Sequence, residues 1–293
     1  RDRRRGSGSE KLPGLLERYA RAGSENRNFN GELTMLSPKD KILIVGLGLI
    51  GGSYAEALTD GGFTVGAIDV DAESIEYALK KGIIRSGTVF TDENYIKNFD
   101  VIIFALYPEK LLAWITENQH KIKSGAVLTD VSGVKCATVY PVQSILRRDL
   151  EFIGAHPMRG REVLGVKNAT KKIFEGGNFI VTPTEKNTVK GIAVASDVGV
   201  AIGAKKISVI TPEEHDEMIG FVSQLTHLIA VALMNCKDSA QLSDYTGDSF
   251  HDLTRIAKIN EDLWCGLFMM NKDALLKDTD AFIDKITEIR DCI

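Results

Sequence analysis

Cysteine is scarce in this sequence of 293 residues, and long apolar runs are missing from it. The four cysteines show neither Cys-x-x-Cys nor mixed Cys/His spacing; they are Cys136, Cys236, Cys265 and Cys292. We therefore expect reduced thiols in a cytoplasmic protein, with neither a disulfide framework nor a metal site. No apolar run approaches the roughly 20 residues of a membrane span, and no secretory signal is visible.

A strong charge of either sign is missing as well. The formal net charge is -4 at pH 7, with 26% charged and 44% hydrophobic residues. This balance predicts a globular protein with a sizeable core and argues against a general role in binding nucleic acid or anionic membranes. The length suits two domains. Residues 1–34 begin with an Arg-rich stretch and Gly-Ser repeats, so we expect a flexible extension or a tag there; a basic arm is the alternative.

A short apolar run leads into a glycine-rich turn. Residues 41–45 read KILIV, which is typical of a strand buried on both faces, and residues 46–53 read GLGLIGGS before a helical pattern. In this context Gly46 allows the tight strand-to-helix turn. Gly48 lets the backbone approach a pyrophosphate, and Gly51 allows close packing of the helix on the strand. A glycine turn of some other α/β protein is the alternative to a dinucleotide site.

The predicted dinucleotide site includes an acidic residue at the end of the next strand. Asp69 follows the apolar run 63–68, where it can accept hydrogen bonds from ribose hydroxyls. Its charge repels a 2′-phosphate and no arginine follows it directly, so the sequence favours NAD over NADP. The residues predicted to bind the cofactor are Gly46, Gly48, Leu49, Ile50, Gly51, Asp69, Leu106 and Ser132.

Strand and helix patterns alternate through the first part of the chain. Further strands are predicted at 63–68, 100–105, 126–130, 152–154 and 178–182. This alternation predicts the α/β class, with a doubly wound parallel Rossmann sheet over residues 38–184. Ligands bind at the carboxyl ends of the strands in such sheets, which makes the segment 130–135 a candidate. His156 is a candidate too, on a sharp turn marked by Gly154 and Pro157.

Helical patterns dominate residues 185–293, the predicted second domain. Helices are expected at 186–201, 211–236, 238–246, 249–258, 260–269 and 271–291. Thr211 and Pro212, followed by two glutamates, give a clear helix start. The helix that they open is apolar enough to be buried between two subunits, so we predict an all-helical dimerisation domain and a homodimer.

Three polar side chains in these helices are candidates for substrate contact. His215 and His227 lie twelve residues apart, which places them within about 120° of each other around an α-helix. For each, a structural histidine with satisfied hydrogen bonds is the alternative. For Arg255 the alternative is an ion pair with Asp252 at i and i+3.

Several separate motifs carry a resemblance to a known family. They are GLGLIGGS at 46–53, DVSGVK at 130–135, GAHPMRGRE at 154–162 with Gly165, TPEEHD at 211–216, residues 223–227 and FHDLTRIA at 250–257. Over about residues 40–291 the chain resembles the prephenate/arogenate dehydrogenases of tyrosine biosynthesis. The resemblance implies a Rossmann domain, a helical dimerisation domain and the NAD-dependent oxidative decarboxylation of prephenate to 4-hydroxyphenylpyruvate.

The same resemblance implies roles for individual residues. His156 accepts the proton of the substrate's C4 hydroxyl as hydride departs, a task suited to a group that titrates near neutral pH. Arg255 clamps a substrate carboxylate. His215 and His227 line the far wall of the pocket, and Glu162 lines its rim.

One position departs from the family pattern. Many relatives carry, at the position of Gly133, a serine that hydrogen-bonds the C4 hydroxyl and the catalytic histidine. Here either the Ser132 hydroxyl takes over this role, or a water fills the gap, or His156 acts alone. Ser132 is therefore a catalytic candidate and Gly133 a candidate for substrate binding.

Other interpretations stay open. The nearest is the same chemistry on arogenate. A β-hydroxyacid dehydrogenase is another, although the motif of its catalytic lysine is not matched around Lys190. A non-catalytic NAD-binding regulator is the third. The resemblance also makes tyrosine a candidate feedback inhibitor, and neither nucleic acid nor membrane is expected as a partner.

Overall fold

The computed structural model describes residues 35–161, 163–237 and 241–293. The chain forms two compact units: one holds the residues up to Ser132 and Thr138–Pro212, the other Gly133–Ala137 and Glu213–Ile293. The extension predicted at residues 1–34 lies outside the described residues.

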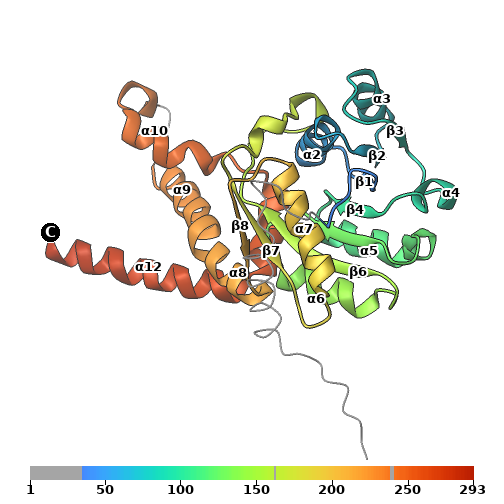
Figure 1. The fold of residues 1–293 in the computed structure, drawn as a ribbon. Helices are drawn as coiled ribbons and strands as arrows, with labels where there is room; N and C mark the ends of the chain where they lie inside the picture. The colour runs from blue at the N-terminus through green and yellow to red at the C-terminus, as the bar shows by residue number, and fades with distance from the viewer. Residues whose placement is uncertain (1–34, 162, 238–240) are drawn as a thin grey trace, which may run out of the picture. The chain divides into compact units, whose positions relative to one another are not determined.

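An eight-stranded sheet forms the centre of the first unit, in the order β3-β2-β1-β4-β5-β6-β7-β8 (Figure 1). The strands are β1 (Lys41–Val45), β2 (Thr64–Ile68), β3 (Ser86–Thr88), β4 (Val101–Phe104), β5 (Val127–Asp130), β6 (Glu151–Pro157), β7 (Asn178–Thr182) and β8 (Lys206–Val209). β6 and β7 pair antiparallel, and the other neighbours pair in parallel. The predicted α/β class and doubly wound sheet are confirmed.

Helices cover both faces of this sheet (Figure 1). They are α2 (Leu49–Asp60), α3 (Ala72–Lys80), α4 (Glu93–Ile96), α5 (Pro108–Asn118), α6 (Cys136–Ile145) and α7 (Val189–Ala201). Ile42 and Ile44 of β1 join the core that includes side chains of α2, α3 and α7. Leu43 and Val45 join the opposite core, with side chains of α5 and α6. This double burial explains why the strand has apolar residues at consecutive positions.

The sheet continues past the domain boundary that the sequence predicted between residues 184 and 185. β8 pairs in parallel with β7, and α7 packs on the same strands. The boundary therefore lies near Pro212, and the predicted division into 38–184 and 185–293 is too early. The strand was missed because Lys206–Val209 has only four residues, half-buried at the edge of the sheet, and no continuous apolar run.

The second unit is helical. Its helices are α8 (Pro212–Ile219), α9 (Thr226–Asn235), α10 (Asp248–Thr254), α11 (Glu261–Met270) and α12 (Lys272–Cys292). The predicted helix 211–236 contains a π-helical segment, Gly220–Leu225, between α8 and α9. Its wider turns change the angle between His215 and His227 from the α-helical expectation. The helix predicted at 238–246 falls partly outside the described residues, and its described part holds only a 3₁₀ turn, Leu242–Asp244.

One helical stretch is long and apolar enough to cross a membrane, judged by length and composition only. Among the described residues it is Pro212–Asn235, with 24 residues, whereas no apolar run near the length of a membrane span was expected from the sequence. A single helix of this kind is weak evidence, because a helix packed inside a protein or between subunits meets the same test.

Candidate active site

The glycine-rich turn connects β1 to α2. Gly46 has φ +96°, and a Cβ there would lie 2.6 Å from the carbonyl oxygen of Ala105. A Cβ on Gly51 would lie only 1.9 Å from the carbonyl oxygen of Gly46, whereas one on Gly48 would meet no described atom within 4 Å. The packing of the protein itself therefore requires glycine at 46 and 51. The space at Gly48 is open to a ligand.

Helix α2 begins at Leu49 beside this open space. It has no side-chain cap from the described residues and no acidic residue in its first turn. The first N–H groups of a helix have no partner within it, and the helix dipole makes this end positive. The backbone at Gly48, Leu49, Ile50 and Gly51 can therefore hold a pyrophosphate.

The carboxylate of Asp69 lies at the carboxyl end of β2 and supports the turn. One oxygen accepts a hydrogen bond from the Leu47 backbone N–H at 2.5 Å, and the other accepts one from the Asp71 N–H at 2.8 Å. An acid at this place suits the ribose hydroxyls of an adenosine and disfavours a 2′-phosphate. Leu106 follows the end of β4, the strand on the other side of β1, and packs beside Gly46.

A second carboxylate organises the end of β5. Asp130 is 1% exposed and accepts hydrogen bonds from the backbone N–H groups of Ser132 at 3.1 Å and Ala155 at 3.0 Å. The pairing of β5 with β6 ends one residue earlier, so the Asp130 side chain supplies the acceptor that a longer β5 would have offered to Ala155. It thereby fixes the loop after β5 to the strand that carries His156.

His156 lies inside a strand, where the sequence predicted a turn. It pairs with Ile180 of β7, in an antiparallel ladder that runs from Gly154 to Pro157. The predicted sharp exit at Gly154 is wrong because β7 gives this segment a partner after β5 has ended. The half-buried imidazole lies near the carboxyl end of β6, the edge of the sheet at which β1 leads into the glycine turn.

The Ser132 hydroxyl has partners within the protein. It donates to Asp130 and lies 3.2 Å from the Thr138 hydroxyl oxygen. The residue is 6% exposed. Its proton is thus directed at Asp130, and the catalytic and cofactor contacts predicted for Ser132 stay predictions. Gly133, the next residue, is partly exposed in the loop before α6.

Two candidates of the second unit have accessible side chains. His227 has Nδ1 2.8 Å from the Ser223 carbonyl oxygen, so Nδ1 carries a proton and Nε2 is the acceptor nitrogen of the neutral ring. Its ring stacks on Trp264 with centroids 3.8 Å apart. Arg255 is exposed in a 3₁₀ turn after α10. Among the described residues no ion pair joins Arg255 to Asp252.

The remaining two candidates are placed differently. His215 is 0% exposed, and its Nδ1 lies 2.7 Å from an oxygen of Asp216. This contact fits the alternative of a structural histidine better than the predicted place of His215 on the wall of a substrate pocket. Glu162 lies outside the described residues.

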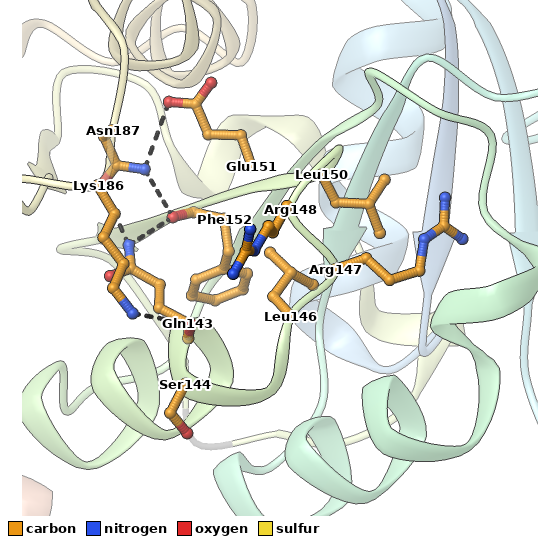
Figure 2. Close-up of a pocket in the computed structure, with 10 residues that line it drawn as sticks. All are labelled: Gln143, Ser144, Leu146, Arg147, Arg148, Leu150, Glu151, Phe152, Lys186 and Asn187. Carbon is orange, nitrogen blue, oxygen red and sulfur yellow. Dashed lines mark hydrogen bonds between the residues drawn. The ribbon is translucent and has the colours of Figure 1, made fainter.

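A pocket of about 390 Å³ lies at the other end of β6 (Figure 2). Gln143 and Asn187 each donate to the Phe152 carbonyl oxygen at 2.9 Å, and Glu151 accepts from the Thr188 backbone N–H. Its amide groups thus hydrogen-bond to one another and to the backbone. The pocket is separate from the edge that holds His156, and we assign no ligand to it.

Comparison with known families gives a clear result. The model of the prephenate dehydrogenase nucleotide-binding domain matches residues 54–208, more than half of the chain. The model of the prephenate dehydrogenase dimerization domain matches residues 211–293. The chain belongs to the prephenate dehydrogenase family. The resemblance inferred from the motifs is confirmed, and the gap between the two matches agrees with the structural boundary near Pro212.

Individual members of the prephenate dehydrogenase family are similar over most of the chain. Prephenate dehydrogenase of Bacillus subtilis is 30% identical over 262 residues, which cover 86% of this chain and 70% of that protein. Cyclohexadienyl dehydrogenase of Zymomonas mobilis is 25% identical, with coverages of 86% and 88%. The structure of prephenate dehydrogenase from A. aeolicus in complex with hydroxyphenyl propionate and NAD+ is 30% identical, has a TM-score of 0.79 and covers 87% of this chain and 91% of that one.

Sequence reasoning missed the residues that hold the candidates in place. Asp130 and Asp216 stood inside the quoted motifs, but nothing in the sequence showed which backbone N–H groups they accept from. Trp264 lies 37 positions after the histidine on which it stacks, and no spacing rule connects them. The only available signal was the position of Asp130 at the end of a predicted strand, since Asp216 stood inside the predicted helix 211–236.

Proposed function

We propose that this member of the prephenate dehydrogenase family catalyses the NAD-dependent oxidative decarboxylation of prephenate to 4-hydroxyphenylpyruvate, a step of tyrosine biosynthesis. The observation that carries the proposal is His156 at the same edge of one sheet as the glycine turn. The open space at Gly48 and the uncapped start of α2 suit a dinucleotide, and the A. aeolicus relative was solved with NAD+.

The residues suit this chemistry in distinct roles. NAD, when bound, supplies the acceptor for the hydride that leaves C4 of the ring. The His156 imidazole accepts the proton of the C4 hydroxyl, for which a group titrating near neutral pH is well suited. The bond to the ring carboxylate then breaks, its electron pair completes the aromatic ring, and carbon dioxide leaves. The phenolate regains a proton.

The proposal also assigns substrate contacts to residues of the second unit and of the loop between β5 and α6. The exposed guanidinium of Arg255 can bind a carboxylate through two parallel hydrogen bonds. His227 offers Nε2 as an acceptor on a ring held by Trp264. Gly133 and Glu162 complete the proposed substrate contacts, and Ser132 holds its loop to Asp130.

Turnover is the direct test. The protein is mixed with NAD and prephenate, then with NAD and arogenate, and NADH is followed by absorbance. His156→Asn should lower kcat by about 10²–10⁴-fold, the loss expected for a general base, while the Kd of NAD stays within about twofold. Absence of NADH with both substrates would refute the proposal, and faster turnover of arogenate would reassign the substrate. Adding tyrosine to the same assay tests the proposed feedback inhibition.

We also propose that the protein is a homodimer joined through the second unit. The dimerization-domain match covers all of that unit's helices. Among its described residues from Glu213 onward, few apolar side chains are buried; they are Ile219, Leu225, Ala230 and Leu275. In α12, Leu276, Ile283, Ile286 and Ile289 are each about half exposed. These four residues are spaced by seven, three and three positions, so they share one side of the helix, and an exposed apolar stripe of this kind is typical of a helix that packs on another helix.

A matched pair of substitutions tests the dimer. Ile286→Glu places a charge on the apolar stripe, whereas Ala281→Glu places the same charge on another side of α12. Light scattering should give twice the chain mass of 32.1 kDa for the wild type and for the Ala281 variant. The Ile286 variant should give the mass of one chain. A monomeric wild type, or a dimer in all three, would contradict the proposed interface.

A cytoplasmic location is proposed with this function, because the four cysteines are free thiols and the cofactor is an intracellular one. Fractionation of cells that express the protein would test it, with recovery in the membrane fraction as the contrary result.

A further inference from the structure

A buried polar cluster in the second unit surrounds Asp216, a residue to which the proposed reaction gives no role. One carboxylate oxygen accepts a hydrogen bond from the Lys135 backbone N–H at 2.7 Å and lies 2.7 Å from Nδ1 of His215. The other oxygen accepts a hydrogen bond from the Cys136 N–H at 2.8 Å. Asp216 is 5% exposed, and His215 and Lys135 are 0% exposed. The carboxylate thus joins α8 to the loop that leads into α6.

The charges in this cluster support an ionised carboxylate. Burial alone raises the pKa of Asp216, but hydrogen bonds from His215 and from the backbone of Cys136 and Lys135 outweigh it, so the pKa is lowered. Burial, the charge of Asp216 and a hydrogen bond to it raise the pKa of the Cys136 thiol to about 12. The thiol therefore stays protonated, and its reactivity reports on the charge of Asp216.

The anchored loop is the one that carries the departure from the family pattern. Lys135 and Cys136 follow Ser132 and Gly133 after one intervening residue, Val134, and Cys136 is the first residue of α6. The start of a helix has N–H groups without partners in the helix. Asp216 satisfies them from outside, which gives the loop one fixed position. At its other end the loop is held by Asp130.

The cluster extends further into the second unit. Asn271, which lies between α11 and α12, donates to the Asp216 carbonyl oxygen and to the Gln224 side-chain oxygen, each at 2.8 Å. Gln224 in the π-helical segment donates to the Leu267 carbonyl oxygen at 3.0 Å. These bonds fix the backbone of Asp216 and thereby the direction of its carboxylate.

We propose that Asp216 is a positioning residue whose carboxylate, oriented by His215, clamps the loop after β5 at Lys135 and Cys136. His215 then serves Asp216 through Nδ1 and is not a contact of the substrate. This inference rests on the proposed function for its effect on turnover, but the clamp itself is a statement about the geometry.

Asp216→Asn keeps the size of the side chain and removes its charge. We expect kcat for prephenate to fall by about 10–100-fold, the loss typical when a hydrogen-bonding group that supports a metal site from outside is removed. KM and the Kd of NAD should change less than about threefold, and alkylation of Cys136, followed by peptide mapping, should become faster. The control is Glu217→Gln, which removes one negative charge at a side chain that is 69% exposed. It should behave as the wild type.

A second pair of variants separates the clamp from a substrate contact. His215→Asn retains a donor near the place of Nδ1, whereas His215→Phe has none. The clamp predicts kcat within about threefold of the wild type for the Asn variant and a loss like that of Asp216→Asn for the Phe variant. Equal losses with a raised KM would show that His215 contacts the substrate and would overturn the inference. Unchanged kcat in a folded Asp216→Asn protein would overturn it as well.

The two proposals fail in distinguishable ways. A wild type that turns over neither prephenate nor arogenate refutes the proposed function, and Cys136 alkylation still tests the clamp. If Asp216→Asn does not fold, the two His215 variants and ¹⁵N NMR of the wild-type histidines test the clamp instead. The clamp requires a proton on Nδ1 of His215, and a proton on Nε2 alone would refute it.

Discussion

Replacing either of two glycines in the turn after β1 with alanine should impair the protein, but for different reasons. Gly48 has φ -74°, which alanine adopts without strain, and its added Cβ would meet no described atom within 4 Å. At Gly51 the Cβ would lie 1.9 Å from the Gly46 carbonyl oxygen and 3.0 Å from the Ala105 Cβ. The first contact is with backbone, which cannot move aside as a flexible side chain does. Gly48→Ala should therefore impair binding and Gly51→Ala should impair folding.

The expected losses of stability and of NAD affinity follow from general magnitudes applied to these contacts. Overpacking a tight site costs about 1–3 kcal/mol, and overlap with backbone places Gly51→Ala at the upper end. At about 2–4 °C per kcal/mol for a unit of this size, a loss of about 3 kcal/mol lowers Tm by about 6–12 °C. Hydrogen bonds to a charged group contribute about 1.5–3 kcal/mol, so losing the backbone approach to a pyrophosphate at Gly48 weakens NAD binding by about tenfold to a hundredfold.

Both variants are compared with the wild type by differential scanning calorimetry and by titration calorimetry with NAD. Gly48→Ala should keep the Tm of the wild type within about 2 °C and lose NAD affinity, since its Cβ occupies open space. Gly51→Ala should have a lower Tm than the wild type even when no cofactor is added. The reasoning is refuted if Gly48→Ala binds NAD as tightly as the wild type, or if Gly51→Ala is as stable as the wild type.

Two further predictions concern carboxylates. Asp69→Ser should raise the Kd of NAD by at least about tenfold and narrow the preference over NADP, because it removes an acceptor for ribose hydroxyls and a charge that repels the 2′-phosphate; an unchanged ratio of the two Kd values in titration calorimetry would contradict this. Hydrogen bonds from Arg147 lower the pKa of Asp149 to about 2. A carboxyl group whose pKa is lowered by folding stabilises the folded state at pH values above its ordinary pKa near 4. That stabilisation is lost as the pH falls toward 2. The Tm advantage of the wild type over Arg147→Gln should therefore shrink between pH 5 and pH 2, and an advantage that is independent of pH would contradict it.

Local pattern was sufficient where a residue's neighbours in sequence are also its neighbours in space. The run 41–45 and the glycine turn after it were predicted because burial on both faces demands consecutive apolar residues and the turn demands Gly46 and Gly51. Asp71, the residue before α3, likewise caps that helix by accepting a hydrogen bond from the Glu73 N–H two residues later. In these cases the physical cause acts over a few residues.

The sequence pattern did not predict the structure where a residue's partner comes from a distant part of the chain. The sequence Gly154–Pro157 is typical of a turn, yet it forms a strand because β7, more than 20 residues later, pairs with it. β8 was missed since its four residues, one exposed and three half-buried, carry too little periodicity. The role of His215 depends on Asp216, its direct neighbour in sequence, but also on the hydrogen bond that Asn271, at the α11–α12 junction, donates to the Asp216 carbonyl oxygen. No local rule contains that information.

The loops of the candidate site have one physical problem in common, which explains the repeated use of aspartate. A loop that leaves a sheet or enters a helix has backbone N–H groups without a regular partner, and such groups are costly when buried. Asp69 accepts the N–H of Leu47, and Asp130 those of Ser132 and Ala155. Asp216 accepts the N–H of Lys135 and of Cys136. Each carboxylate joins its own segment of the chain to a second one. The order of the proposed active site therefore depends on both oxygens of these three side chains as hydrogen-bond acceptors, and replacing any one residue with asparagine should disturb its own loop while the sheet stays folded.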